Sequence, residues 1–353
     1  MTGPSNTTIV IPNWNGAHHL PECLDSLSRQ TLEASEVLVV DNGSSDDSVE
    51  LIKQAFPWVR VIEHADNRGF PAAVNAGIRE SRGEFIALLN NDTRAEPDWL
   101  ERLVGAMKRW PDASFAACKM LRYEPPHCID SAGDRFSLLA GAGSNLGAGQ
   151  PREAHSEFAW TFGACAGAAL YRRALFDDIG LFDEDFFLVF EDVDFDLRAQ
   201  VAGHRCLYVP DAVVYHKRGA STDSASLEVR SRIWRNAVWV AGKNLPPLLL
   251  SGWLVAFTLR LARRAVLSGL AGAWQRLRPT ATGSATTNNP SASRRRSRLD
   301  ALRHYYGPAL KQALSSLPSK RREIRHLRRR GSLSLLPSLL RPTRPISDDR
   351  PAL

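Results

Sequence analysis

Short apolar stretches alternate with helical patterns through the first 90 residues, and this alternation limits the fold more than any other feature. Each apolar stretch is hydrophobic almost throughout, which is typical of strands buried on both faces of a parallel sheet. The predicted strands are 8–12, 36–41, 59–64 and 84–90, and the predicted helices are 21–30, 48–56 and 71–81. The pattern therefore predicts an α/β fold, with a mainly parallel sheet and helices on both faces.

Polar residues follow three of these strands. Asn13 follows the first strand, Asp41 the second, and Asn91 and Asp92 the fourth. Parallel sheets bind ligands at the carboxyl ends of their strands, so we expect these side chains at a ligand site. The Asp41 carboxylate could accept an N–H from a pyrimidine base. The residues after it, 42–45, are explained equally well by turn and N-cap chemistry.

Two further segments suit phosphate and metal binding. Residues 67–77 contain Gly69 and Asn75 and lead into a helix, and a helix start of this kind can take a diphosphate. There is no GxGxxG or GxxxxGK[ST] motif, which argues against a dinucleotide-binding or P-loop enzyme. Asp92 is well placed to hold a divalent cation that bridges phosphates, although a turn before the helix at 96–108 explains it equally well.

An aromatic stretch runs into an acidic one at residues 186–200, which we expect to turn from strand to helix. Asp192 follows this aromatic stretch, and a carboxylate beside an apolar wall is placed to act as a base. Its acidic neighbours need no function, because the helix dipole favours acids in the first turn. His216 ends a later strand, where a lone histidine is more often structural than a metal ligand.

Charge divides the chain into two regions. Residues 1–243 carry 24 Lys and Arg against 34 Asp and Glu, whereas residues 244–353 carry 21 against 4. A basic tail on an acidic body indicates a polyanionic partner for the tail, either membrane headgroups or nucleic acid. The five cysteines are scattered and include no CxxC, which favours a reducing compartment over a disulfide framework or a zinc site. The N-terminus lacks a signal-peptide pattern, so we expect a cytoplasmic body.

The start of the tail favours contact with a membrane surface. Residues 245–259 carry no charge, but this run is shorter than the roughly 20 residues needed to span a bilayer. Arg260, Arg263 and Arg264 follow on one helical face, and burying each would cost about 2.5–3.5 kcal/mol. We therefore expect amphipathic membrane-interface helices over 244–279 rather than a span.

The rest of the tail, 280–353, is expected to be basic and largely disordered, with possible short helices. It opens with a low-complexity linker at 280–293. Arginine clusters at 294–298 and 320–330 would add attraction to anionic lipid, on the order of 1 kcal/mol per residue. A solvated basic tail without a partner is the alternative.

Six segments, in this order and spacing over residues 8–221, resemble the inverting family-2 glycosyltransferases, especially their bacterial rhamnosyltransferase-like branch. They are IPNWNG (11–16), VVDNGSSDDS (39–48), NRGFPAAVNAG (67–77), LLNNDT (88–93), GLFDEDFFLVFEDVDF (180–195) and His216 with the small residues after it. The resemblance implies a GT-A fold over 1–243, with a Rossmann-like nucleotide-sugar half at about 1–94 and an acceptor half at about 95–243. It also implies a nucleoside-diphosphate sugar donor and Mg²⁺ or Mn²⁺.

The resemblance also implies roles for individual residues. Eight residues would bind the nucleotide sugar: Asn13, Trp14, Asn15, Asp41, Asn67, Gly69, Asn75 and Asn91. Asp92 matches the last acid of the family's DxD metal motif, His216 matches a metal-ligating histidine, and Asp192 matches the general base. Acceptor-side or supporting roles fall to Glu191, Phe190 and Gly163.

The chain departs from the family at the metal motif, where Asn90 and Asn91 precede Asp92. With a single carboxylate, the site should need the donor's diphosphate oxygens to complete the metal's ligands. Mixed oxygen and imidazole ligation makes Mn²⁺ at least as suitable as Mg²⁺.

The expected function is inverting, metal-dependent sugar transfer in cell-surface polysaccharide synthesis, at the inner face of the cytoplasmic membrane. The donor would be dTDP-rhamnose, and the acceptor a hydroxyl of a saccharide or lipid-linked saccharide. Galactofuranose, glucose, galactose or an N-acetylhexosamine stay open as the sugar, as does non-catalytic nucleotide-sugar binding. Nucleic-acid binding is disfavoured because the tail has few interleaved aromatic residues and the body is acidic. The sequence predicts no oligomeric state.

Overall fold

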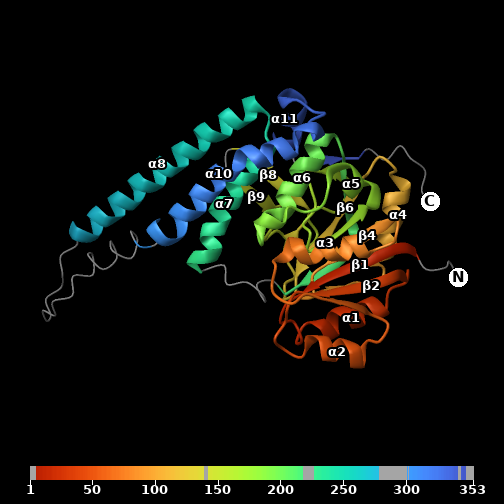
Figure 1. Ribbon diagram of the computed structural model, residues 1–353. Helices are drawn as coiled ribbons and strands as arrows, with labels where there is room; N and C mark the ends of the chain where they lie inside the picture. The colour runs from red at the N-terminus through yellow and green to blue at the C-terminus, as the bar shows by residue number, and fades with distance from the viewer. Residues whose placement is uncertain are drawn as a thin grey trace, which may run out of the picture.

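A parallel sheet with covering helices forms the N-terminal half of the molecule, as the alternating pattern predicts (Figure 1). The structure is a computed structural model that describes residues 5–138, 142–217, 226–277, 300, 302–340 and 343–346. Four parallel strands lie in the order β4-β1-β2-β3. These elements are β1 (Ser5–Asn13), α1 (Leu20–Ser28), β2 (Ala34–Asp41), α2 (Ser48–Ala55), β3 (Arg60–Glu63), α3 (Phe70–Glu80) and β4 (Phe85–Leu89).

Beyond β4 the sheet becomes mixed and reaches eleven strands, in the order β13-β10-β12-β6-β11-β4-β1-β2-β3 with β5 and β7 alongside. The added strands are β5 (Thr93–Ala95), β6 (Phe115–Arg122), β7 (Ile129–Ser131), β10 (Ala159–Thr161), β11 (Ala168–Arg172), β12 (Cys206–His216) and β13 (Thr343–Pro345). Helices α4 (Trp99–Arg109), α5 (Arg173–Ile179) and α6 (Glu191–Ala202) lie in the same part of the chain as these added strands. In the pairing of β12 with β5, His216 lies opposite Thr93. This register brings the end of β12 beside the end of β4.

The core lies on both faces of the sheet, because successive side chains of a strand point to opposite sides. On β1, Ile9 and Ile11 pack into a cluster with α1, α2 and α4, whereas Val10 packs into another with α3, α5 and α6. All three side chains are buried. This double burial explains why the strands read as continuous apolar runs in the sequence.

The strands β8 (Asp134–Ser137) and β9 (Ala142–Asn145) pair in a separate two-stranded sheet. One prediction about an irregular segment is wrong. The predicted strand before Asp192 is a short 3-10 helix, η1 (Glu184–Phe186), followed by a loop. Three non-glycine residues of this loop have positive φ, namely Phe187, Val189 and Phe190. Such backbone conformations are incompatible with a strand.

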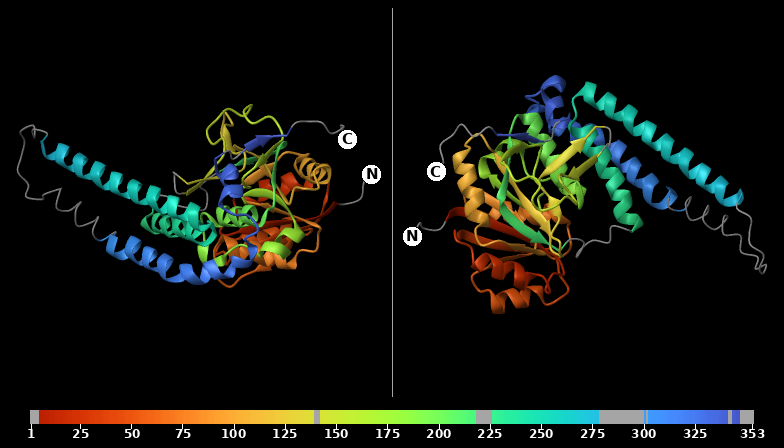
Figure 2. Two further views of the ribbon diagram at one scale, coloured as in Figure 1. Left: turned by 90° about the horizontal axis from the view of Figure 1, so that it is seen from above. Right: turned by 180° about the vertical axis from the view of Figure 1, so that it is seen from behind.

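Helices form over most of 244–279, where we expected them, and also over much of 302–340, within the tail that we expected to be largely disordered with possible short helices. The C-terminal region contains the helices α7 (Leu227–Asn244), α8 (Pro247–Leu277), α10 (Gly307–Glu323) and α11 (Ser332–Leu340). The short helical turns η2 (Leu302–Tyr306) and η3 (Arg325–Leu327) flank α10. Figures 1 and 2 show α8 and α10 projecting from one side of the body, whereas α11 returns to it. The return is stabilised by packing: Trp239, Trp253 and Leu335 are buried in one cluster with Phe186 and Val193 of the body. The strand β13 also joins the sheet edge at β10.

Within the described residues, no helix combines the length and apolar character needed to cross a membrane. The predicted linker at 280–293 and the arginine cluster at 294–298 lie outside the part of the chain that the structure describes. So do the small residues after His216 that belong to the sixth motif, at 219–222.

Candidate active site

A pocket of about 300 Å³ opens where β1 and β4 end, at the sheet edge that the sequence indicates. Seven predicted site residues line it: Asn13, Trp14, Asn67, Gly69, Asn91, Asp92 and His216. Its other lining residues are Pro12, Asn42, Phe70, Ala73, Asn90, Phe187 and Leu188. Five side chains of this lining are asparagines and one is a carboxylate, so a bound diphosphate would meet little negative charge.

A hydrogen-bonded chain of side chains joins the ends of three neighbouring strands behind this pocket. Nδ2 of Asn13 donates to Oδ1 of Asp41 at 2.9 Å, which leaves Oδ1 of Asn13 to accept from Nδ2 of Asn91 at 2.7 Å. An ionised carboxylate at position 91 could not make this bond, because it has no hydrogen to donate. The amide in the metal motif is therefore explained by the local hydrogen bonding.

Asp41 lies behind this pocket and not among its lining residues. It is 3% exposed, and its carboxylate also accepts hydrogen bonds from the N–H and Oγ of Ser44, at 2.9 and 2.6 Å. That Asp41 also accepts from a base stays a prediction. Asn15 likewise lies outside the lining: its Oδ1 accepts from the N–H of Ser45 at 2.8 Å and shapes the turn. Trp14, by contrast, lines the pocket with 42% of its surface exposed.

The start of α3 forms the opposite wall. Oδ1 of Asn67 accepts from the N–H of Gly69 at 2.9 Å and from Nδ2 of Asn42 at 3.0 Å. Gly69 has a φ of 86°, and a Cβ there would collide with Phe187 of the neighbouring loop, so glycine is required on both counts. The N–H of Phe70 donates to the carbonyl of Phe187 at 2.8 Å. This bond fastens the 183–190 loop to the pocket.

Asn75, which we expected to bind the nucleotide sugar, is not among the lining residues of this pocket. It is buried, with Nδ2 donating to the carbonyl of Phe182 at 2.8 Å and Oδ1 accepting from its N–H at 3.0 Å. Nδ2 also contacts the Glu184 carboxylate at 3.0 Å. Asn75 therefore supports the site indirectly, by anchoring the chain that leads into the 183–190 loop.

Three side chains meet at the candidate metal position. Nε2 of His216 lies 3.3 Å from Oδ1 of Asp92, while Nδ1 of His216 lies 2.7 Å from Oδ2 of Asp130. Burial alone would lower the pKa of His216, but its contacts with Asp130 and Asp92 raise it to about 9. Burial alone would raise the pKa of Asp92, and the contact with His216 lowers it instead.

This arrangement fits a divalent cation. Oδ1 of Asp92 is buried and accepts no well-directed hydrogen bond from the described residues, so it has a free position for a ligand. The imidazole of His216 faces the same point, and Asp130 fixes its orientation through the other ring nitrogen. A carboxylate behind a ligating histidine is common in metal sites. Asp92 and His216 could therefore hold Mg²⁺ or Mn²⁺, with Asp130 supporting them, when the cation displaces the proton on Nε2 of His216.

The predicted base lies in an adjoining pocket of about 180 Å³, formed by the loop before α6 and by β8 and β9. Phe190, Glu191, Asp192 and Asp134 line it. The N–H of Val193 donates to Oδ1 of Asp192 at 2.8 Å, which favours the ionised form of this carboxyl. Burial nevertheless raises the pKa of Asp192 above its usual range.

The neighbouring acids keep their protons more strongly. Carboxyl oxygens of Asp134 and Asp192 lie within 4.8 Å of each other and of Sγ of Cys165. Asp134 is 1% exposed, and burial and then the charge of Asp192 raise its pKa well above the usual range. The same two causes raise the pKa of Glu191 to about 8. Among these carboxyls, Asp192 is the one placed to be ionised and to take a proton.

Gly163 supports this second pocket without lining it. Its carbonyl accepts from the N–H of Asp134 at 2.9 Å, and a Cβ on Gly163 would collide with the Asp196 carboxylate. Phe190 has a φ of 71° and directs the chain into α6 just before Glu191. Both residues therefore fix the backbone around the predicted base.

Sequence reasoning missed several residues of the site. Asn42 and Asn90 line the first pocket. Each lies in a polar stretch directly after a strand, and turn chemistry explains such a stretch equally well. Asp130 and Asp134 carry no local signal, because only the pairing of β7 with β6 and of β8 with β9 brings them to His216 and Asp192.

Comparisons with known proteins agree with this geometry. The family model for Glycosyl transferase family 2 matches residues 8–180. An N-acetylglucosaminyl-diphospho-decaprenol L-rhamnosyltransferase of Mycobacterium tuberculosis is 31% identical over 239 residues, which cover 61% of this chain and 76% of the relative. The chain therefore belongs to glycosyltransferase family 2. It is an enzyme of the glycosyltransferase class, similar to a rhamnosyltransferase.

Solved structures support the fold. TarS 1–349 of S. aureus in complex with UDP superposes with a TM-score of 0.51 at 17% identity, covering 91% of this chain and 90% of that one. GalNAc-T7, solved with UDP, GalNAc and Mn²⁺, gives a TM-score of 0.53 at 18% identity, covering 68% and 49%. At these identities the likeness shows the fold alone, which is the predicted GT-A fold.

Proposed function

We propose that the protein transfers a sugar from a nucleoside-diphosphate donor to an acceptor hydroxyl, with a divalent cation and with inversion at the anomeric carbon. The observation that carries this proposal is the adjacency of two different pockets. One is lined by neutral amides around the Asp92–His216 pair, which suits a nucleoside diphosphate and a cation. The other is lined by Asp192, and the two pockets meet on one loop, where Leu188 lines the first and Val189 the second.

Asp192 acts as the general base in this proposal. The acceptor oxygen attacks the anomeric carbon, the bond from that carbon to the diphosphate oxygen breaks, and the hydroxyl proton passes to the Asp192 carboxylate. Burial raises the pKa of Asp192 and so makes the carboxylate a better proton acceptor. A single displacement with one base inverts the anomeric centre. Retention would require a second, nucleophilic carboxylate at that carbon.

The donor half holds the leaving group. Asp92 and His216 would bind the cation, which when bound neutralises charge on the departing diphosphate. The amides of Asn67 and Asn91 face the same pocket and can donate to phosphate or ribose oxygens. Trp14 offers an exposed aromatic surface at its rim. Mn²⁺ suits the imidazole ligand at least as well as Mg²⁺ does.

We infer dTDP-rhamnose as the donor and a saccharide or lipid-linked saccharide as the acceptor, in cell-surface polysaccharide synthesis. The support is the similarity to the Mycobacterium tuberculosis relative, an N-acetylglucosaminyl-diphospho-decaprenol L-rhamnosyltransferase. Galactofuranose, glucose, galactose and N-acetylhexosamines are the alternatives for the sugar. Non-catalytic binding is the alternative for the activity.

A lipid-linked acceptor would place the enzyme on the inner face of the cytoplasmic membrane, and α8 offers a surface for this. Leu248, Val255 and Leu259 are each more than 60% exposed and share one helical face. The opposite face packs inward through Trp253, which is 1% exposed. No acidic residue occurs in residues 247–277, so nothing on this helix would be repelled by anionic headgroups.

A donor screen tests the proposed function. Thermal stabilisation would be measured with Mn²⁺ and each nucleotide sugar, and transfer to a polyprenyl-diphosphate-linked N-acetylglucosamine would follow. We expect the largest stabilisation with dTDP-rhamnose, and a product whose anomeric configuration, read by NMR, is opposite to that of the donor. A product with the donor's configuration would overturn the inverting mechanism, and stabilisation without any transfer would support the non-catalytic alternative.

A further inference from the structure

The loop at 183–190 connects the two pockets. Phe187 and Leu188 line the donor pocket, and Val189 and Phe190 line the pocket that contains the base. Three residues of this loop have φ values between 63° and 71°, a conformation that non-glycine residues adopt only when their surroundings hold them there. The shape of both pockets therefore depends on whatever holds this loop.

Helix α7 holds the backbone of the loop. Asn236 is fully buried. Its Nδ2 lies within hydrogen-bond distance of three loop carbonyls: that of Phe186 at 3.1 Å, that of Leu188 at 3.0 Å and that of Val189 at 2.7 Å. Nη2 of Arg235 donates at 3.0 Å to two carbonyls, those of Asp185 and Phe186. These bonds satisfy carbonyl groups that no strand or helix partner could reach in this backbone conformation.

Helix α10 and the end of α7 hold the acidic side chains of the same segment. Nζ of Lys320 contacts the Asp183 carboxylate at 2.8 Å and the Asp185 carboxylate at 2.6 Å. Nζ of Lys243 contacts Asp183 at 2.7 Å and Asp194 of α6 at 2.9 Å. The Lys320 and Lys243 side chains are only 4% and 3% exposed, so their pairs with Asp183 and Asp194 are largely shielded from water, whereas the Asp185 side chain is 69% exposed.

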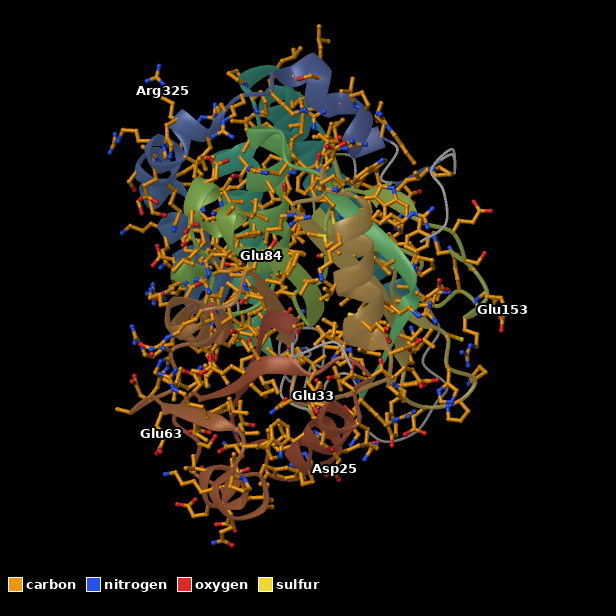
Figure 3. The ribbon with its side chains drawn as sticks, turned by 90° about the vertical axis from the view of Figure 1, so that its right-hand side faces the viewer. Asp25, Glu33, Glu63, Glu84, Glu153 and Arg325 are labelled. Atoms are coloured by element: carbon orange, nitrogen blue, oxygen red, sulfur yellow. The ribbon has the colours of Figure 1, made fainter. Side chains whose placement is uncertain are left out.

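Part of the basic cluster at 320–330 thus faces the protein, whereas Arg322 and Arg325 are exposed, so the expected attraction of the cluster to anionic lipid stays a prediction. Nη1 of Arg321 donates to the carbonyl of Gly242, and Nη2 of Arg328 donates to that of Lys243 at 3.0 Å. Arg329 pairs with Asp178 at 2.6 Å. Figure 3 shows Arg325 of the same cluster at the opposite end of the molecule from Asp25 and Glu63 of the donor half.

We propose that the C-terminal helices α7 and α10 act as a clamp that holds the 183–190 loop in its transfer-competent shape, with Lys320 as a positioning residue. The proposal rests on the proposed function, since it assigns the loop to a donor pocket and a base pocket. Lys320 touches neither pocket and acts only through Asp183 and Asp185. The family model ends at residue 180, so the clamp comes entirely from the chain beyond it.

The test compares Lys320→Met with Lys311→Met, which removes an exposed lysine from the same helix. The readouts are hydrogen exchange of the peptides covering 183–190 and β1, and kcat and KM for donor and acceptor. We expect Lys320→Met to speed exchange in 183–190 at least tenfold with β1 unchanged, and to lower kcat at least tenfold. Lys311→Met should match the wild type, and Lys320→Arg should recover part of kcat.

The outcomes separate the clamp from a merely structural role. Uniformly faster exchange in Lys320→Met, or kcat within twofold of the wild type, would overturn the proposal. If Lys320→Met does not fold, Asp185→Asn removes one partner at a more exposed position and should change the same readouts in the same direction. A wild type inactive with every donor would contradict the proposed function, whereas selectively faster exchange in 183–190 would still support the clamp.

Discussion

The donor half and the C-terminal helices are built from different polar chemistry. Around the donor pocket, short neutral side chains such as Asn13 and Asn91 bond to one another directly after their strands. In the C-terminal helices, long cationic side chains reach distant carboxylates: Lys320 pairs with Asp183, 137 positions away. Both kinds of contact join residues far apart in the sequence, 78 positions for Asn13 and Asn91, but the first lies at strand ends that the sequence pattern predicts, whereas no sequence pattern marks the second. Perturbing charge should therefore affect stability most in the C-terminal helices and ligand binding most in the donor half.

The largest effect on stability is expected from Lys320→Met. Removing one partner of a buried ion pair typically lowers the free energy of unfolding by about 3–5 kcal/mol, and we expect the lower end of this range or less because Lys243 still pairs with Asp183. Urea denaturation at pH 7 measures it. Lys311→Met, an exposed change, should stay within about 0.5 kcal/mol of the wild type. Equal losses in the two variants would contradict the buried pairing.

Asp130→Asn should weaken binding of Mn²⁺ about 10–100-fold in the presence of dTDP. The reason is that a carboxylate behind a ligating histidine orients the ring and strengthens it as a ligand, and Asp130 contacts Nδ1 of His216. Titration calorimetry measures the affinity. The control is Asp211→Asn, an exposed carboxylate on the same strand as His216. Unchanged Mn²⁺ affinity in Asp130→Asn would remove Asp130 from the site.

Acid should destabilise the protein partly through the clamp. Burial alone would raise the pKa of Asp183, but the charges of Lys243 and Lys320 outweigh it and lower the pKa to about 2. Since the unfolded pKa is about 3.9, this stabilisation is complete above about pH 5 and is lost as the pH falls toward 2. It amounts to about 2 kcal/mol. Asp183→Asn should flatten the decrease between pH 5 and 3, and a decrease as steep as in the wild type would count against this origin.

Asn91→Asp should give the smallest effect, about tenfold weaker donor binding. The new carboxylate cannot donate to Asn13, and its charge would repel the donor's diphosphate. Asn6→Asp, at an exposed position of the same sheet, is the matched control. Titration calorimetry with dTDP and Mn²⁺ compares the two. If Asn91→Asp binds as tightly as the wild type, then the neutral lining is not needed for donor binding.

The difference between the two regions also explains what the sequence could predict. The strands, helices and polar strand ends of the donor half follow from short apolar runs, and the family motifs place Asp92 and His216 together. The bonds of Asn75 to Phe182 could not be predicted, because the position of Asn75 in the motif gives no sign of them. Asp130 and Lys320 could not be assigned at all, because their partners lie 86 and 137 positions away. The charge contrast between body and tail was visible in the sequence, but the ion pairs between the two were not.

The central claim is that Asp192 is the base of a glycosyl transfer whose donor sits in the neighbouring pocket. The most direct test is Asp192→Asn, compared with Glu33→Gln, an exposed change just before β2, at the opposite end of that strand from the donor pocket. Loss of a general base typically lowers the rate about 10²–10⁴-fold. We predict that loss in the turnover of Asp192→Asn, with dissociation constants for donor and Mn²⁺ within threefold of the wild type. Unchanged turnover in Asp192→Asn would contradict the account.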